Sequence, residues 1–241
     1  TFRQVDPLFV LDLADPARPR VLGELKIPGW SDYLHPVNAT HLLGLGKAAD
    51  ADGQVQGLKV ALFDVTEPQA PKEAYSLSLG DRGSESEATW DHKAFLFHAP
   101  SALLVFPLTL RQIPADTPPE DRAWAWGELV VDGAVVLHLG PDSFQHRGYI
   151  SHLKETPSED FGWWHSVRKI YRSGFMSSGD QEVLFSYSQR ELQVHDLSDL
   201  SAPISQVELS APQCVAEPAD WMSQAAFLCN FQCEQMLQIK K

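Results

Sequence analysis

The chain has 241 residues, of which 44% are hydrophobic and 21% charged, and this composition is that of a folded protein rather than a disordered one. Its 32 acidic residues outnumber the 19 basic ones and give a formal charge of −13, which argues against nucleic acid and anionic lipid as partners. Its apolar runs fall far short of the roughly 20 residues that a membrane helix needs, so no membrane span is predicted in this segment.

An internal repeat is the strongest pattern in the chain. Residues 9–22, 61–74 and 194–203 share a frame in which an alternating apolar stretch ends in Asp and is followed by a Pro-containing turn. Asp and Ser side chains bond to nearby backbone groups and Pro fixes φ, so this frame is typical of a turn between two antiparallel strands. Residues 135–142 hold a weaker copy, in which His138 replaces the Asp.

The copies recur at the interval of a propeller blade. The turn residues Asp12, Asp64, His138 and Asp196 are separated by 52, 74 and 58 residues, and four-stranded repeats of this length are typical of β-propellers. The longest interval contains residues 111–127, a Pro-rich segment that we interpret as a loop inserted between two strands. A helical fold is disfavoured by 15 Gly and 17 Pro, and a β-sandwich would not explain the repeat.

The expected strands fall into four groups along the chain. An incomplete blade within residues 1–28 is predicted to hold two outer strands, at residues 8–13 and 20–27. The blade within residues 29–79 is predicted to have strands at residues 31–37, 41–46, 58–65 and 72–79. The blade within residues 80–162 is predicted to have strands at residues 88–97, 102–110, 133–139 and 148–153. The blade within residues 163–210 is predicted to have strands at residues 167–175, 182–188, 192–197 and 204–209.

The sequence therefore predicts an all-β fold, a β-propeller of four-stranded antiparallel blades. We expect about three and a half blades here, as part of a larger ring. The tail, residues 211–241, carries Cys214, Cys229 and Cys233 and is predicted to form a further strand or a short helix. An odd number of cysteines excludes complete internal pairing, so one disulfide and buried thiols both stay open as interpretations.

Several short motifs support a family resemblance over nearly all of residues 1–210. These motifs lie at residues 1–8, 29–36, 57–65, 80–84 and 90–95. In them the chain resembles the secreted bacterial and archaeal proteins whose C-terminal part is called the beta-propeller domain, a family of unassigned function. The resemblance implies a secreted or cell-envelope protein with further blades and a leader upstream. It implies no reaction, so no catalytic residue is assigned.

Five polar residues are candidates for ligand binding. Propellers usually bind ligands near the central channel, on the segments around the innermost strands. Asp32 and His35 lie at the predicted innermost strand of the first complete blade, Asp91 and His92 at that of the second, and Arg82 in the loop between them. Imidazoles and carboxylates can hold a metal ion, so His35, His92, Asp32 and Asp91 are a candidate channel site. The guanidinium of Arg82 can bind a carboxylate ligand through two parallel hydrogen bonds. The alternative interpretation is a structural hydrogen bond from each residue to a neighbouring strand or turn.

A second candidate is a metal site in the turn that contains Asp50 and Asp52. Alternating acidic residues before Gly53 resemble the start of a calcium loop. Two carboxylates are few for an ion that takes six to eight oxygens, so a solvated hairpin turn is the other interpretation. The sequence thus predicts no cofactor, with calcium or another divalent metal as the alternative.

The expected function is that of an extracytoplasmic binding or interaction module. The chain has no serine elbow, phosphate loop, paired-histidine zinc helix or dinucleotide fingerprint, so a non-enzyme is expected before an enzyme. The partner would be an unknown protein, a glycan or a small ligand. Two alternatives stay open: a metal-assisted hydrolase or lyase with its site at the central channel, and a structural scaffold.

Overall fold

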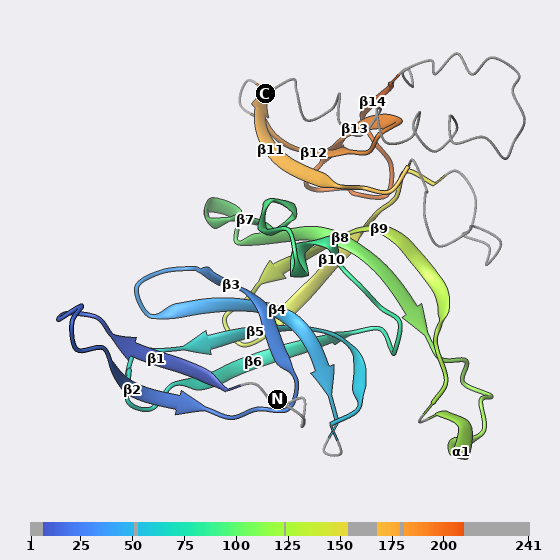
Figure 1. Cartoon of the computed structure of the whole chain (residues 1–241). Coiled ribbons are helices and arrows are strands. Elements are labelled where there is room, and N and C mark those ends of the chain that lie inside the picture. The colour runs from blue at the N-terminus through green and yellow to red at the C-terminus, as the bar shows by residue number, and fades with distance from the viewer. Residues whose placement is uncertain (1–6, 51–52, 123, 154–167, 179–180, 210–241) are drawn as a thin grey trace, which may run out of the picture.

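The computed structural model describes residues 7–50, 53–122, 124–153, 168–178 and 181–209. Nearly all of its regular structure is antiparallel β-sheet, arranged as a two-stranded hairpin followed by three four-stranded sheets (Figure 1). The hairpin consists of β1 (Leu8–Asp12) and β2 (Arg20–Leu25). The first four-stranded sheet consists of β3 (Trp30–Pro36), β4 (His41–Ala49), β5 (Val55–Asp64) and β6 (Lys72–Leu79).

The other two sheets repeat the same architecture. The second consists of β7 (Leu96–His98), β8 (Leu103–Gln112), β9 (Glu128–Leu139) and β10 (Phe144–Ile150). The third consists of β11 (Arg172–Ser178), β12 (Gln181–Tyr187), β13 (Glu191–Asp196) and β14 (Ser205–Glu208). In all three sheets the strands pair in chain order. The predicted all-β fold of four-stranded antiparallel sheets, forming part of a propeller, is confirmed.

The core lies between successive sheets, and β8 shows why. Side chains alternate between the two faces of a strand. Leu104 and Phe106 therefore pack into the cluster shared with the first sheet, while Leu103 and Val105 pack into a second cluster with residues of the third sheet such as Leu184. All four β8 side chains are buried, because this strand belongs to the central sheet of the three.

The repeated Asp closes the turn between the two outer strands. The side-chain oxygen of Asp12 accepts a hydrogen bond from the backbone N–H of Ala14 at 2.9 Å, and Asp64 accepts one from Thr66 at the same distance. Asp196 bonds to Ser198 in the same way at 2.8 Å. Such a bond two residues on mimics a backbone turn. The repeat is therefore a turn signal.

The predicted strand at residues 88–97 is largely wrong. Most of this segment forms two 3₁₀ turns, η1 (Glu87–Thr89) and η2 (His92–Ala94), and only β7 extends it as a strand. The side chain of Ser86 accepts a bond from the N–H of Ala88, and that of Asp91 accepts one from Lys93. These local caps satisfy N–H groups that a strand would have used for pairing.

The insertion in the second sheet joins β8 to β9 and contains α1 (Pro119–Arg122). None of the helices in the described ranges is long and apolar enough to cross a membrane. Asp52 and the tail with its three cysteines lie outside the described residues, as does residue 163, where the third complete blade was predicted to begin. The predicted blade limits stay predictions.

Candidate functional site

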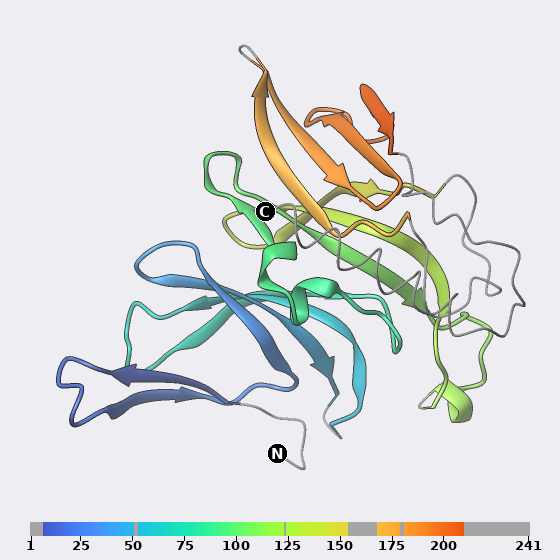
Figure 2. The same cartoon turned by 45° about the horizontal axis from the view of Figure 1, so that its top comes forward.

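The innermost segments of the three four-stranded sheets meet at one place. The turns η1 and η2 of the second sheet lie between β3 of the first and β11 of the third (Figure 2); η1 contacts β3, and η2 contacts β11. In a propeller the innermost strands surround the central axis. We call the following set of side chains the inner rim: Tyr33, His35, Trp90, Asp91, His92, Lys93 and Arg172.

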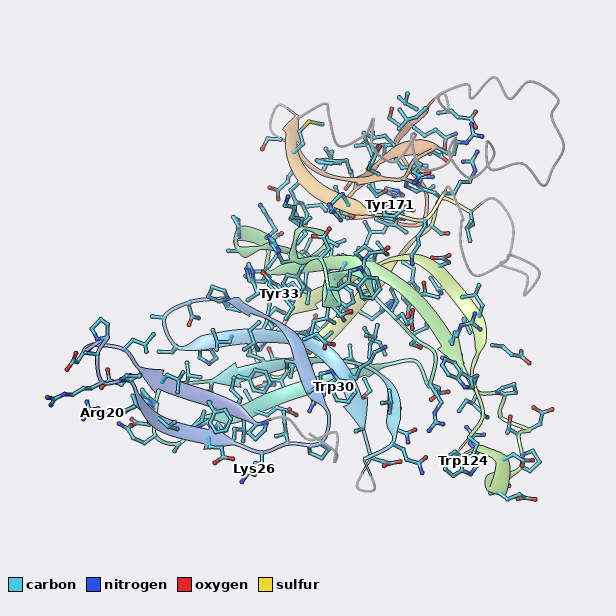
Figure 3. The ribbon with its side chains drawn as sticks, viewed as in Figure 1. Arg20, Lys26, Trp30, Tyr33, Trp124 and Tyr171 are labelled. Carbon is cyan, nitrogen blue, oxygen red and sulfur yellow. The ribbon has the colours of Figure 1, made fainter. Side chains whose placement is uncertain are left out.

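The two predicted histidines come together around one tyrosine. The hydroxyl of Tyr33 lies 3.2 Å from Nδ1 of His35, and the ring of His92 stacks on Tyr33 with centroids 6.4 Å apart. Phe95 packs at 5.0 Å from the Tyr33 ring and 5.3 Å from that of His35. Burial lowers the pKa of His35, so its imidazole is neutral at pH 7. Figure 3 shows Tyr33 where β3 approaches the innermost segment of the second sheet.

Asp91 joins the second sheet to the third. Its side chain caps η2 by accepting a bond from the N–H of Lys93 at 3.0 Å, and it also accepts one from Nη2 of Arg172 at 2.5 Å. Partial burial acts to raise the pKa of Asp91, but the bonds from Lys93 and Arg172 outweigh it and lower the pKa overall. The carboxylate is therefore ionised at neutral pH and already bonded by this chain's own groups.

Trp90 presents the largest exposed ring of the inner rim. Its side chain is 64% exposed, although its backbone is held by a hydrogen bond from its N–H to the carbonyl of Glu87 at 3.1 Å. His92 and Lys93 are exposed beside it. A fixed backbone segment thus carries an indole, an imidazole and an ammonium group into solvent. These groups can stack on a ring and donate hydrogen bonds to ligand oxygens.

Asp32 is bonded to a different neighbour. The register of β3 against β4 shifts between Ser31 and Tyr33, which places Asp32 at a bulge. Its carboxylate accepts a bond from Nε1 of Trp30 at 2.9 Å. Partial burial raises the pKa of Asp32, against the effects of the Trp30 bond and the charge of Lys47. The structure thus pairs Asp32 with Trp30, while His35 bonds to Tyr33.

Arg82 and Asp50 both help to close loops. Nη2 of Arg82 donates to Oε1 of Gln54 at 3.2 Å, which ties the loop between two sheets to the turn after β4. Asp50 accepts bonds from the N–H of Gln54 and from Nε2 of Gln56, so it closes its own turn. Within the part of the chain that the structure describes, no three His, Cys, Asp or Glu side chains are grouped so that they could hold a metal ion.

The family follows from a comparison with known proteins. The model of a family described as the beta propeller domain matches residues 1–200. The chain belongs to this beta propeller domain family. It is 41% identical over 107 residues to an uncharacterized protein of Archaeoglobus fulgidus, and 41% identical over 106 residues to one of Methanocaldococcus jannaschii. The two alignments cover 44% and 42% of this chain, but only 16% of each relative's own length.

Sequence reasoning missed the cations that this propeller domain uses to join its second and third sheets. Arg172 reaches Asp91, which is 81 positions away in the sequence. Nζ of Lys169 lies 3.2 Å from Oε2 of Glu87. Ion pairs over such sequence distances leave no local pattern. Aligning the innermost segments of the three blades would have indicated that Asp91 and Arg172 lie on neighbouring sheets. The 3₁₀ turns at residues 87–94 interrupt that alignment.

Proposed function

We propose that this propeller domain is a binding or interaction module whose ligand contacts the inner rim. The observation that carries the proposal is the exposure of Trp90, His92 and Lys93 on a fixed backbone segment where three sheets meet. Exposed aromatic side chains anchored in rigid backbone are common centres of protein and ligand interfaces.

The chemistry of the rim favours a ligand that combines a ring or apolar group with oxygen acceptors. Asp91 and Arg172 pair at 2.5 Å, whereas the exposed Lys93, three positions after Trp90, forms no ion pair with any of the described residues. A glycan, a carboxylate-bearing small ligand and a protein segment all offer these features. The rim would therefore select acceptors although the whole chain carries a charge of −13.

We also propose that the module works outside the cytoplasm, on the basis of its resemblance to secreted beta-propeller proteins. The test is fractionation of cells that express the epitope-tagged natural protein. Recovery in the envelope or medium is expected, and recovery with cytoplasmic markers alone would contradict this part of the proposal.

The test of binding is a panel of glycans, peptides, small carboxylates and the ions Ca²⁺, Zn²⁺ and Mn²⁺, screened by thermal shift and followed by titration. Each ligand found is then titrated against Trp90→Ala and against the control Trp124→Ala. Trp124 is 72% exposed but lies beside α1, away from the inner rim (Figure 3).

Loss of the indole contact should weaken binding by about tenfold, which corresponds to about 1.4 kcal/mol. Trp124→Ala should bind like the unmodified chain. Binding that is equally sensitive to both substitutions, or to Trp124→Ala alone, would show that the ligand does not contact the inner rim. A panel without any bound probe would contradict the proposal as a whole.

A further inference from the structure

The third sheet packs on the second through a face that carries buried polar side chains (Figure 1). Leu184 on β12 belongs to the apolar cluster that the two sheets share, and Ser186, two residues further on, points to the same side. His195 and Gln193 of β13 lie opposite these two residues in the register. The buried polar side chains of this region of the third sheet are Ser186, Ser188, Glu191, Gln193 and His195.

The contact between the first and second sheets has a different composition. Its cluster consists of apolar side chains such as Leu43, Phe106 and Val135. The imidazole of His35 at the inner edge of this contact is only half-buried. Protonation of histidines should therefore weaken the contact between the second and third sheets more than the contact between the first and second.

His152, in the segment that follows β10, is the central titratable group of the polar contact. Its Nδ1 and Nε2 both lie within hydrogen-bonding distance of hydroxyl groups, those of Ser188 and Ser186 respectively. A neutral imidazole offers one donor and one acceptor, and a hydroxyl can pair with either. Protonation would place a charge between the sheets, where the side chain is almost completely buried.

The charged groups around His152 do not offset its burial. Glu191 on β13 acts to raise the pKa of His152, but its carboxylate is already paired with Nη1 of Arg168 at 2.5 Å. Nη2 of Arg168 pairs with Glu208 of β14. Arg168 and His195 both act to lower the pKa of His152, as does burial, which has the largest effect.

His195 adds a second buried imidazole to the same face. Its Nε2 lies 3.1 Å from Oε1 of Gln193. Burial lowers the pKa of His195, against the effect of the backbone carbonyls of Ala202 and Leu200. Protonation of either histidine therefore favours separation of the second and third sheets.

Ion pairs also join these two sheets closer to the inner rim. They are Asp91 with Arg172, Glu87 with Lys169, and His98 with Glu182. The last pair opposes separation in acid, because a protonated His98 attracts the Glu182 carboxylate. The side chains of His98 and Glu182 are 20% and 35% exposed, so solvent weakens this attraction.

We propose that the contact between the second and third sheets opens in acid, when protonation of His152 and His195 releases the third sheet while the first two sheets stay packed together. The closed contact is most stable above pH 6.5, the ordinary pKa of histidine, and loses stability as the pH falls toward 4. Opening separates Arg172 from Asp91 and divides the inner rim. Release of a rim ligand by acid is the consequence, and this consequence rests on the proposed function.

The experiment measures the opening of each contact separately, through the reactivity of a buried cysteine. Val136 and Val135 are fully buried neighbours on β9. Val136 belongs to the cluster shared with the third sheet, and Val135 to the cluster shared with the first. Val136→Cys and its matched control Val135→Cys are made in a chain whose natural cysteines are changed to Ser. Labelling by a dipyridyl disulfide at pH 7.5 and pH 5 is divided by the rate at Ala17→Cys, in an exposed turn.

The pKa of His152, 6.5 in the open state and about 4 in the closed state, should raise the equilibrium constant for opening about 30-fold between pH 7.5 and pH 5. Val136→Cys should therefore be labelled at least about 30-fold faster at pH 5, and Val135→Cys less than about threefold faster. His152→Gln should reduce the acceleration at Val136→Cys by at least about tenfold. Equal acceleration at both positions, no acceleration at Val136→Cys, or an acceleration that His152→Gln leaves unchanged would overturn the proposal.

Amide hydrogen exchange of the unmodified chain keeps the proposal testable if a cysteine variant does not fold. Protection, measured against an unstructured chain at the same pH, should fall at pH 5 in β12 and β13 and persist in β4 and β5. Equal loss of protection in both sheets, or none in either, would overturn the proposal. Neither measurement contains a ligand, so failure of acid opening is distinguishable from failure of the inner rim to bind.

Discussion

Acidification should destabilise the domain through His152. This side chain is 1% exposed between the second and third sheets. Its Nδ1 lies 2.9 Å from Oγ of Ser188 and its Nε2 lies 2.8 Å from Oγ of Ser186. Burial lowers the pKa of His152 to about 4, against the charge of Glu191 and with a smaller lowering effect from Arg168 and His195.

The direction of the stability change depends on whether the folded or the unfolded state binds the proton more readily. An unfolded chain protonates His152 near its ordinary pKa of 6.5, whereas the folded domain protonates it only near pH 4. The contribution to stability is therefore complete above pH 6.5 and is lost as the pH falls toward 4. The shift from 6.5 to about 4 corresponds to about 3 kcal/mol, and most of this loss should have occurred by pH 4.5.

The assay is urea unfolding, followed by tryptophan fluorescence at pH 7.5 and at pH 4.5. The unmodified domain is compared with the variant His152→Gln, whose side chain still forms hydrogen bonds but is not protonated in this pH range. The variant should be less stable by about 1 kcal/mol at pH 7.5, because one hydroxyl loses its partner. Between the two pH values the unmodified domain should lose about 2–3 kcal/mol more than the variant.

His146→Gln is the control, since His146 is exposed and its substitution leaves the interior unchanged. This control should follow the pH dependence of the unmodified domain. If His152→Gln loses as much stability as the unmodified domain on acidification, then His152 is not the buried neutral group described here, and the reasoning from its burial is refuted.

Three further predictions concern packing and ion pairing, and all are measured by urea unfolding. Gly44→Ala should cost about 1–3 kcal/mol, because a Cβ there would lie 2.6 Å from Cε2 of Phe63; an unchanged midpoint would show that the Phe63 ring can move aside. Leu104→Ala should cost about 2–5 kcal/mol, since Leu104 is fully buried between two sheets, and a smaller loss would place it outside the core. A double-mutant cycle of Asp91→Asn and Arg172→Gln should give a coupling below about 1 kcal/mol, because both side chains are 35% exposed; a larger coupling would mean that the pair is effectively buried.

The fold could be predicted to the extent that local chemistry repeats. Asp12 and Asp64 each close a turn by the same bond to the backbone two residues on, and such a bond depends only on neighbouring residues. The strand predicted over residues 88–97 failed for the same reason. Its apolar residues suggested a strand, but the capping side chains of Ser86 and Asp91 favour 3₁₀ turns.

The candidate site could be predicted only in part. His35 and His92 both lie against the ring of Tyr33, because all three belong to innermost segments of adjacent sheets. Asp32 is bonded to Trp30 because of a bulge, and a one-residue change of register leaves no mark in the sequence. The partner of Asp91 could not be found either, since Arg172 reaches it from another sheet.

The most direct test of the inner rim as a binding surface is amide hydrogen exchange of the domain with and without a ligand from the panel. Binding at the inner rim should slow exchange in residues 86–95 and in β3, and should leave exchange in α1 and in the β1–β2 hairpin unchanged. Protection confined to α1 or to the hairpin, with none at residues 86–95, would contradict it.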